Sequence, residues 1–290
     1  MPHEAMRIAA VQQDIATRLT GAGVPEARLE AGLLLCHVLG CSRAGLVLRA
    51  GEELSPEMLA RLEELLARRL RREPLAHLVG EQEFWSLLFV VSRSVLIPRP
   101  ETEELLERVL AVAADHGLPP GPIVDLGAGS GVISVVLALE LADRRVVAVD
   151  RSLEALRIAR ENVRRHGVAD RVLLVNGDWL SGLRPEPRFS LVVSNPPYIA
   201  AGALAGLEPE VREYEPQMAL TSGNDGLDAI RLLADRARVV LVPGGWLFME
   251  IGADQGEAVL NLLASFSEYD SVQVHADLAG LPRVAQARCC

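Results

Sequence analysis

The spacing of apolar residues changes along the chain. Over residues 1–75 apolar side chains recur every three or four positions, which is the period of amphipathic helices. One such helix is predicted to run from Pro56, with Ser55 as its N-cap, to the Arg-Arg-Glu-Pro of residues 71–74. We therefore predict a small all-α helical bundle over residues 1–75.

A different pattern follows the bundle. Residues 76–97 are rich in aromatic and β-branched side chains, which favours two short strands joined by a turn, and we expect a connecting β-hairpin there. A helix is predicted to begin near Glu101. From Pro122 onward apolar strands alternate with helices, which predicts an α/β domain over residues 98–290. Its sheet should be mainly parallel and covered by helices on both faces, with an antiparallel edge formed by the last two strands.

The composition disfavours several classes of protein. The chain has 290 residues, 50% of them hydrophobic, and a formal net charge of -10. An acidic protein lacks the broad attraction to phosphates that nucleic-acid binders use, so we expect no direct contact with nucleic acid. No apolar run is long enough to span a bilayer and the N-terminus lacks the apolar core of a signal peptide. We expect a cytoplasmic, monomeric protein without membrane attachment.

The cysteines point in the same direction. Few cysteines and no leader are typical of a reducing compartment. None of them lies near a second cluster of histidine or cysteine, so we expect no metal site. The four cysteines are Cys36, Cys41, Cys289 and Cys290.

The segment Asp-Leu-Gly-Ala-Gly-Ser-Gly, residues 125–131, lies between the first strand and the first helix of the predicted α/β domain. Its three glycines permit a tight turn and a close approach of the backbone to a ligand, and the following helix offers free N–H groups. The spacing is GxGxG and not GxGxxG, which favours a smaller ligand head than a pyrophosphate. The residues of this turn that we expect to contact a cofactor are Gly127, Ala128, Gly129, Ser130 and Gly131.

Two further strand ends carry polar groups. Asp150 ends the second strand, where a carboxylate can accept hydrogen bonds from both hydroxyls of a ribose. Asp178 and Trp179 end the third strand, where an acceptor and an aromatic ring suit the amine and the face of an adenine. Either feature alone is often a helix cap or a core residue. Together with the glycine turn they predict a site for S-adenosyl-L-methionine.

The fourth strand ends in Asn195-Pro196-Pro197-Tyr198. A rigid structural turn is one interpretation, because proline fixes its own φ. Beside a methyl donor, a second interpretation is favoured. The Asn195 side-chain oxygen and the Pro196 carbonyl would each accept one hydrogen of a planar NH2 group, while Tyr198 stacks on that group. The motif suits amines of nucleic-acid bases as well as the amide of glutamine; the acidic charge disfavours the bases.

Longer stretches of the chain resemble the HemK/PrmC family of peptide chain release factor glutamine methyltransferases. The resemblance is carried by Leu-Ile-Pro-Arg-Pro-Glu-Thr-Glu at 96–103, the glycine turn, Asn-Gly-Asp-Trp-Leu, the Asn-Pro-Pro-Tyr motif and Asp-Leu-Ala-Gly-Leu-Pro-Arg-Val at 277–284. It implies a Rossmann-like class I methyltransferase domain that transfers a methyl group from S-adenosyl-L-methionine, leaving S-adenosyl-L-homocysteine. The implied acceptor is the side-chain amide nitrogen (N5) of the glutamine in the Gly-Gly-Gln motif of class I release factors, a modification that supports translation termination.

The same resemblance suggests roles for particular segments. The glycine turn, Asp150, Asp178, Trp179 and Asn195 would bind the cofactor, residues 195–198 would hold the glutamine amide, and the helical bundle would help to bind the release factor. A sister family that modifies a glutamine of a ribosomal protein shares Asn-Pro-Pro-Tyr and stays an alternative, as do amino-methyltransferases of DNA or RNA and a docking module without activity.

Three charged residues receive no firm role from the sequence. Arg99 and Glu101 could line the pocket; alternatively, Glu101 and Glu103 lie in the first turn of a helix, where carboxylates are favoured. Glu250, at the end of the fifth strand, is interpreted as a structural hydrogen-bond acceptor.

Overall fold

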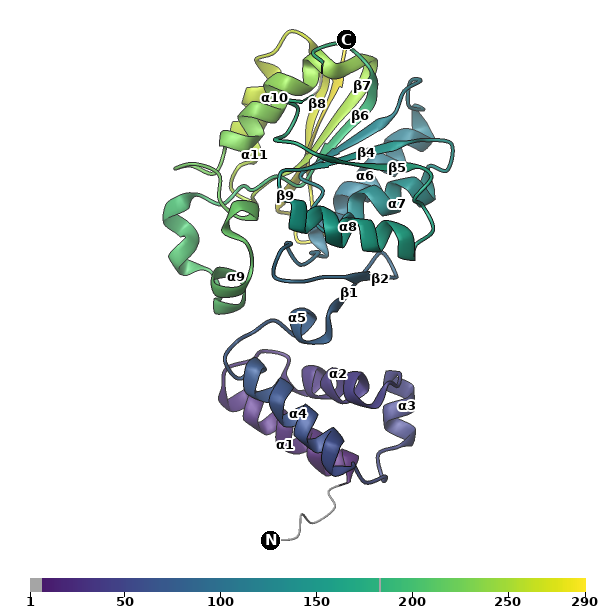
Figure 1. Cartoon of the computed structure of the whole chain (residues 1–290). Coiled ribbons are helices and arrows are strands. Elements are labelled where there is room, and N and C mark those ends of the chain that lie inside the picture. Colours follow the sequence, from purple (N-terminus) through teal and green to yellow (C-terminus); the bar gives the residue numbers. More distant parts are fainter. Residues whose placement is uncertain (1–6, 183) are drawn as a thin grey trace. The chain divides into compact units, whose positions relative to one another are not determined.

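The computed structural model describes residues 7–182 and 184–290. The chain forms two compact units (Figure 1). The first contains the chain up to Gly80 together with the short segment Glu208–Tyr214, and the second contains Glu81–Leu207 and Glu215–Cys290. The chain therefore passes from one unit to the other three times, and we describe each unit by itself.

The first unit is built from helices around an apolar core. Ser55 caps the fourth of these helices, because its hydroxyl accepts a hydrogen bond from the Met58 N–H at 3.3 Å, and Pro56 occupies the first helical position. Leu19, Leu34 and Leu66 lie at the centre of the core and are inaccessible to solvent. The helices are α1 (Ile8–Gly21), α2 (Ala27–Leu39), α3 (Arg43–Leu48), α4 (Pro56–Arg69) and α5 (Leu75–Val79).

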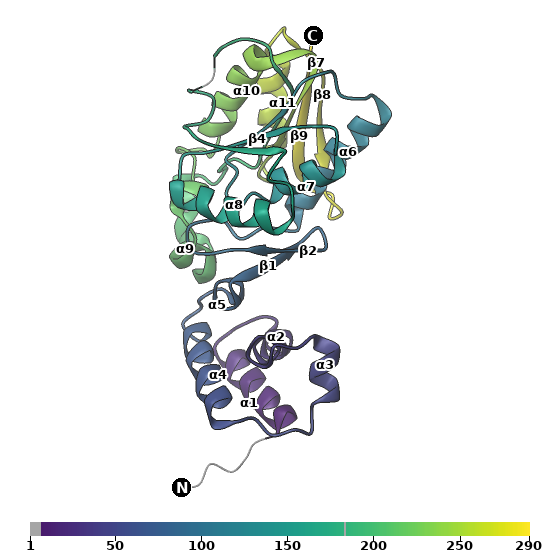
Figure 2. The same cartoon turned by 45° about the vertical axis from the view of Figure 1, so that its right-hand side comes forward.

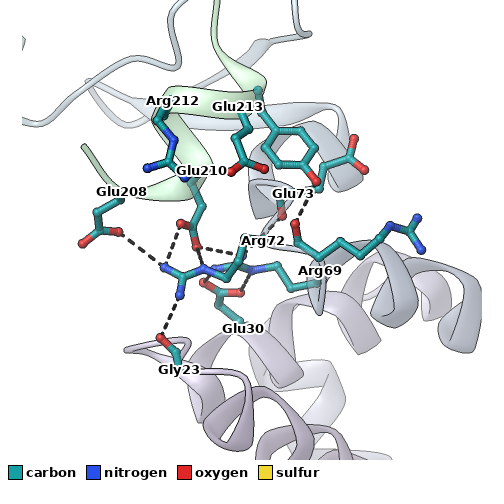
Figure 3. A network of polar contacts seen from close by, with 11 residues as sticks. Gly23, Glu30, Arg69, Arg72, Glu73, Glu208, Glu210, Arg212 and Glu213 are labelled. Atoms are coloured by element: carbon teal, nitrogen blue, oxygen red, sulfur yellow. Dashed lines mark hydrogen bonds and ion pairs between the residues drawn. The ribbon is translucent and has the colours of Figure 1, made fainter. Parts of the chain in front are cut away.

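A sixth helix of this unit comes from far along the chain. The short helix α9 (Pro209–Tyr214) lies in a stretch that the sequence pattern predicts as a long loop of the α/β domain. Its Glu210 accepts hydrogen bonds from Arg69 and Arg72 of the bundle at 2.6–2.9 Å (Figure 3). Arg69 is 3% exposed and also donates to Glu30. A buried ion-pair network therefore fastens α9 to the bundle.

The second unit begins with a β-hairpin, β1 (Glu81–Phe84) and β2 (Leu87–Val90), which pair antiparallel. Trp85 and Ser86 form its two-residue turn with φ angles of 55° and 57°, the left-handed conformation that such tight turns require. The Trp85 N–H donates to the carboxylate of Glu103 at 2.7 Å, which ties the turn to α6 (Glu101–Asp115). The predicted start of this helix is confirmed. The hairpin is present but shorter than the predicted residues 76–97, because residues 75–79 form the helix α5 and the two strands end at Val90.

A seven-stranded sheet forms the centre of the second unit, in the order β5-β4-β3-β6-β7-β9-β8. Pairing is parallel from β5 to β7 and antiparallel between β7, β9 and β8, so the predicted mainly parallel sheet with an antiparallel edge is confirmed. The strands are β3 (Ile123–Leu126), β4 (Val146–Asp150), β5 (Val172–Asn176), β6 (Phe189–Ser194), β7 (Leu241–Glu250), β8 (Tyr269–Ala276) and β9 (Pro282–Cys289).

Helices cover both faces of this sheet (Figures 1 and 2). Successive residues of one strand face opposite sides, so that Ile123 joins the core under α6, α7 and α8, whereas Val124 joins the core under α10 and α11. The remaining helices are α7 (Val132–Glu140), α8 (Leu153–Arg165), α10 (Asp228–Val240) and α11 (Gly256–Ala264), with short 3-10 turns at Ala201–Gly206 and Gln217–Ala219. Within the described residues no helix has the length and apolarity needed to cross a membrane.

Candidate active site at the carboxyl edge of the sheet

The register of three neighbouring strands brings the predicted motifs together. Leu126 of β3 pairs with Ser194 of β6, so the glycine turn and Asn195 follow directly from adjacent positions. Ser194 pairs in turn with Met249 of β7, which places Glu250 next to Asn195 at the same edge. The chain order reverses between β3 and β6, and the carboxyl end of such a switch point is where open α/β sheets bind ligands.

A cavity opens at this edge, and most of the predicted site residues line it. Its walls come from the loop before α6, the glycine turn, the ends of β4 and β5, the Asn-Pro-Pro-Tyr segment and the stretch that follows α9. The predicted residues found in the wall are Gly127, Ala128, Gly129, Ser130, Asp150, Asp178, Trp179, Asn195 and Pro197. Three predicted residues lie beside the cavity and not in its wall: Gly131, Pro196 and Tyr198.

The glycine turn is shaped by close contacts. Gly127 has a φ of 78°, and a Cβ atom there would lie 3.3 Å from the Trp179 ring, so the indole packs directly against the turn. Gly131 has a φ of 82°, and its Cβ would lie 3.1 Å from the Cβ of Ala159 in α8. Gly131 therefore allows close packing between two helices, while Gly127 allows the Trp179 ring to pack close to the end of the strand.

The carboxylate of Asp150 stabilises the turn from the neighbouring strand. One oxygen accepts the Gly129 N–H and the other accepts the Ser152 N–H, both at 2.8 Å. Each carboxylate oxygen has a second lone pair, so Asp150 keeps acceptor capacity toward the cavity that it lines.

A second carboxyl group lies behind the turn. Asp125 is completely buried; one oxygen accepts the Ser134 hydroxyl at 2.6 Å, and the other has no hydrogen-bond partner among the described residues. Burial, together with the charge of Asp150, raises the pKa of Asp125 to about 7, although the hydrogen bond from Ser134 opposes the shift. This group changes its charge near neutral pH.

Asn195 belongs to a buried chain of hydrogen bonds. Its side-chain N–H donates to the Thr102 hydroxyl at 3.1 Å, and that hydroxyl donates to the Glu250 carboxylate at 2.7 Å. Tyr198 donates to the other Glu250 oxygen at 3.1 Å. Burial raises the pKa of Glu250, although both hydroxyl donors oppose the shift. Burial and the neighbouring Glu250 also raise the pKa of Tyr198, which keeps its phenol protonated.

Comparison with known proteins identifies the family of this chain. The model of the PrmC N-terminal domain matches residues 10–80, and that of the methyltransferase small domain matches residues 102–207. A release factor glutamine methyltransferase of Geobacter sulfurreducens is 45% identical over 266 residues, 92% of this chain and 91% of the relative. One of Cereibacter sphaeroides is 44% identical over 283 residues, 98% of this chain and 99% of the relative.

The chain belongs to the release factor glutamine methyltransferases. The resemblance stated from the sequence motifs is thereby confirmed, and with it the prediction of a methyltransferase. Among solved structures, the hMettl16 catalytic domain in complex with MAT2A 3'UTR hairpin 6 matches with a TM-score of 0.56 and 15% identity, covering 82% of this chain and 84% of that one. At this identity the match confirms the class I methyltransferase fold alone.

The cavity also contains residues that received no firm role, or none at all, from the sequence. Arg99 lines the cavity and is paired with Glu215, a buried carboxylate that also accepts the Ile97 N–H at 3.1 Å. Met218 and Ala219 also line the cavity. The sequence contained little indication of these two residues, because apolar positions in the stretch after the tetrapeptide follow neither a helix nor a strand period. Thr102 was visible inside Pro-Glu-Thr-Glu, but its position on the buried face of α6 appears only in the fold.

Proposed function

We propose that this protein transfers a methyl group from S-adenosyl-L-methionine to the side-chain amide nitrogen of the glutamine in the Gly-Gly-Gln motif of class I release factors, leaving S-adenosyl-L-homocysteine. The observation that carries the proposal is the pairing of Leu126 with Ser194, because it sets the glycine turn and Asn195 side by side on one cavity. The names of the relatives support the choice of acceptor.

The residues around the turn fit the proposed cofactor. Gly129 lines the cavity, and a Cβ atom there would meet no atom closer than 4.0 Å, so a ligand can approach the backbone; Asp150 has lone pairs for two ribose hydroxyls. Asp178 and Trp179 line the same wall and offer an acceptor and a ring face to an adenine. When bound, S-adenosyl-L-methionine supplies a methyl group on a positively charged sulfur, which a nucleophilic nitrogen can attack.

The proposed acceptor nitrogen is a poor nucleophile, because its lone pair is delocalised over the amide. Asn195 Oδ1 and the Pro196 carbonyl would each accept one of its hydrogens, which raises its electron density and aims the lone pair. Pro196 and Pro197 hold this segment rigid before the substrate arrives. No general base is required at the attack, since the proton leaves to solvent after the nitrogen has formed its bond to the methyl carbon.

The proposed partner is a protein and not a nucleic acid. The net charge of -10 disfavours phosphate backbones, and the helical unit would help to bind the release factor. A cytoplasmic location and a monomeric state accompany this proposal and stay predictions.

Methyl transfer from labelled cofactor to a purified class I release factor tests the function. We expect labelling of the wild-type factor and none of a factor whose Gly-Gly-Gln glutamine is replaced by alanine. Equal labelling of both would refute the target. Labelling of RNA, DNA or a ribosomal protein in place of the release factor would favour the alternative acceptors.

Asn195→Ala tests the mechanism. We expect kcat to fall about 100-fold or more, because one of two prepositioned acceptors is lost, while the dissociation constant of the cofactor changes little. Asn261→Ala, an exposed position in α11, is the matched control and should behave as wild type. An Asn195→Ala protein with unchanged kcat would contradict the mechanism.

A further inference from the structure

The side-chain amide of Asn195 is linked by hydrogen bonds to two buried residues, Thr102 and Glu250. Thr102, in the first turn of α6, is 3% exposed, and Glu250, at the end of β7, is 1% exposed. These two residues are 148 positions apart in the sequence, yet their oxygens are 2.7 Å apart. The Asn195 Nδ2 lies 3.1 Å from the same Thr102 oxygen.

The number of protons available to Asn195, Thr102 and Glu250 determines which group donates and which accepts in each of these hydrogen bonds. The hydroxyls of Thr102 and Tyr198 favour the ionised form of Glu250 against its burial. In that form Glu250 has lone pairs and no proton to donate, and its two oxygens accept hydroxyl protons, one from Thr102 and one from Tyr198. Thr102 has one hydroxyl proton, which is committed to Glu250. The Thr102 oxygen therefore offers Asn195 a lone pair, and the amide group that can bond to a lone pair is NH2 and not C=O.

We propose that Thr102, held by Glu250, is a positioning residue that sets which way round the Asn195 side-chain amide stands. With Nδ2 turned to Thr102, the planar amide directs Oδ1 away from Thr102, which makes it available as an acceptor at the cavity. This inference rests on the proposed function, since it explains how Asn195 presents an acceptor and not a donor to the NH2 group of the substrate.

The alternative orientation would be harmful. An Asn195 amide rotated by half a turn would present its own NH2 to the substrate's NH2, two donors facing each other, and would lose one of the proposed acceptors. Without the Thr102 hydroxyl the Asn195 amide loses both its orientation and its fixed position, so that the reactive geometry becomes a minor one among several. Thr102 therefore raises the fraction of enzyme in which Asn195 Oδ1 faces the substrate, and it is this fraction that changes kcat.

Thr102→Val and Thr102→Ser test the proposal in the full chain. Valine keeps the shape of threonine without the hydroxyl, and serine keeps the hydroxyl without the methyl group. We expect Thr102→Val to lower kcat for methyl transfer to the release factor about 30-fold with little change in KM, and Thr102→Ser to stay within about 3-fold of wild type. Ser190→Ala, which removes a buried hydroxyl at the opposite end of β6, is the control and should leave kcat unchanged.

A double-mutant cycle separates positioning from general damage. If Thr102 acts through Asn195, Thr102→Val added to Asn195→Ala should lower kcat less than about 2-fold further. A structural role would cost the same factor in both backgrounds. Equal losses in the two backgrounds, an unaffected Thr102→Val enzyme, or a Thr102→Ser enzyme as slow as Thr102→Val would each overturn the proposal.

A readout without turnover separates this inference from the proposed function. The Asn195 side-chain NH2 gives two proton–nitrogen NMR signals, assigned by their loss in Asn195→Asp. We expect slow hydrogen exchange of these signals in wild type and Thr102→Ser, and exchange at least about 10-fold faster in Thr102→Val, because the hydrogen bond is lost. If release factors are not methylated but this difference is present, the proposed function fails and the positioning stands. If exchange is equal in all three proteins, the positioning fails whatever the substrate.

Discussion

The network that holds α9 on the helical bundle makes a quantitative prediction. Glu210 accepts two hydrogen bonds from Arg72, at 2.6 and 2.7 Å, and one from Arg69 at 2.9 Å. Removing one partner of a buried ion pair typically costs about 3–5 kcal/mol. Arg69 would keep Glu30, and Arg72 would keep the Gly23 carbonyl and some contact with water. For Glu210→Ala we therefore expect a smaller loss, about 2–3 kcal/mol.

Most of this loss should appear locally. A helix of six residues such as α9 is too short to be stable alone, so its attachment depends on contacts with the bundle. Hydrogen exchange followed by mass spectrometry on a peptide covering residues 208–214 measures that attachment. With tenfold for each 1.4 kcal/mol, Glu210→Ala should speed the exchange about 30- to 150-fold.

Glu208→Ala provides the matched control. The Glu208 side chain is 69% exposed and lies 3.7 Å from Arg72, so its removal should change the exchange less than about 3-fold. Burial raises the pKa of Glu210, but the hydrogen bonds from Arg72 and Arg69 outweigh it and the net pKa lies below the ordinary value. The contribution of Glu210 is therefore present above about pH 4.5 and is lost as the pH falls through the lowered folded-state pKa. Equal exchange in wild type and both variants at neutral pH would refute the reasoning.

Two further predictions concern the stability of the cofactor-free protein. Because the pKa of Asp125 is raised to about 7, its protonation stabilises the folded state fully below about pH 3.8 and that stabilisation is lost as the pH rises through about 7. Asp125→Asn should therefore raise Tm relative to wild type near pH 8.5, by an equivalent of about 2–4 kcal/mol, and much less near pH 5; a pH-independent difference in Tm would contradict this. Gly131→Ala should lower the free energy of unfolding by denaturant by about 2–3 kcal/mol, and Gly129→Ala by about 1 kcal/mol. Both positions have a positive φ, but of the two only a side chain at Gly131 would also press on Ala159. Equal losses in the two variants would show that the contact with α8 is unimportant.

The architecture of the second unit was predictable because its signals are local. Apolar strand runs, Ser152 as a helix cap and glycines at helix ends each act within a few residues, and all of them agree with one α/β fold. The Ser55–Pro56 start of α4 was predictable for the same reason. The antiparallel pairing of β8 with β9 also followed, because two successive strands without a helix between them usually pair antiparallel.

The attachment of α9 was not predictable from local pattern. A six-residue helix has fewer than two turns, too few for a repeating apolar pattern to be recognised. The stabilising contacts come from Arg69 and Arg72, about 140 residues earlier in the chain. The positions of Thr102 and Glu250 were hidden for a similar reason. Each looks ordinary in its own element, a helix first turn and a strand end, and the contact between them depends on how α6 packs on the sheet.

The tetrapeptide at the end of β6 has contacts on two sides, and these explain why it alone does not define a substrate. Asn195 and Pro197 line the cavity, whereas Tyr198 donates to Glu250 and its carbonyl accepts from Gln255 at 2.9 Å. The prolines thus set the local backbone, and the contacts of Tyr198 fix that backbone against β7 and α11. Under the proposed function, this rigid segment supplies a pair of acceptors for an NH2 group. Which NH2 group can reach it depends on the rest of the wall, which comes from the loop before α6 and the stretch after α9.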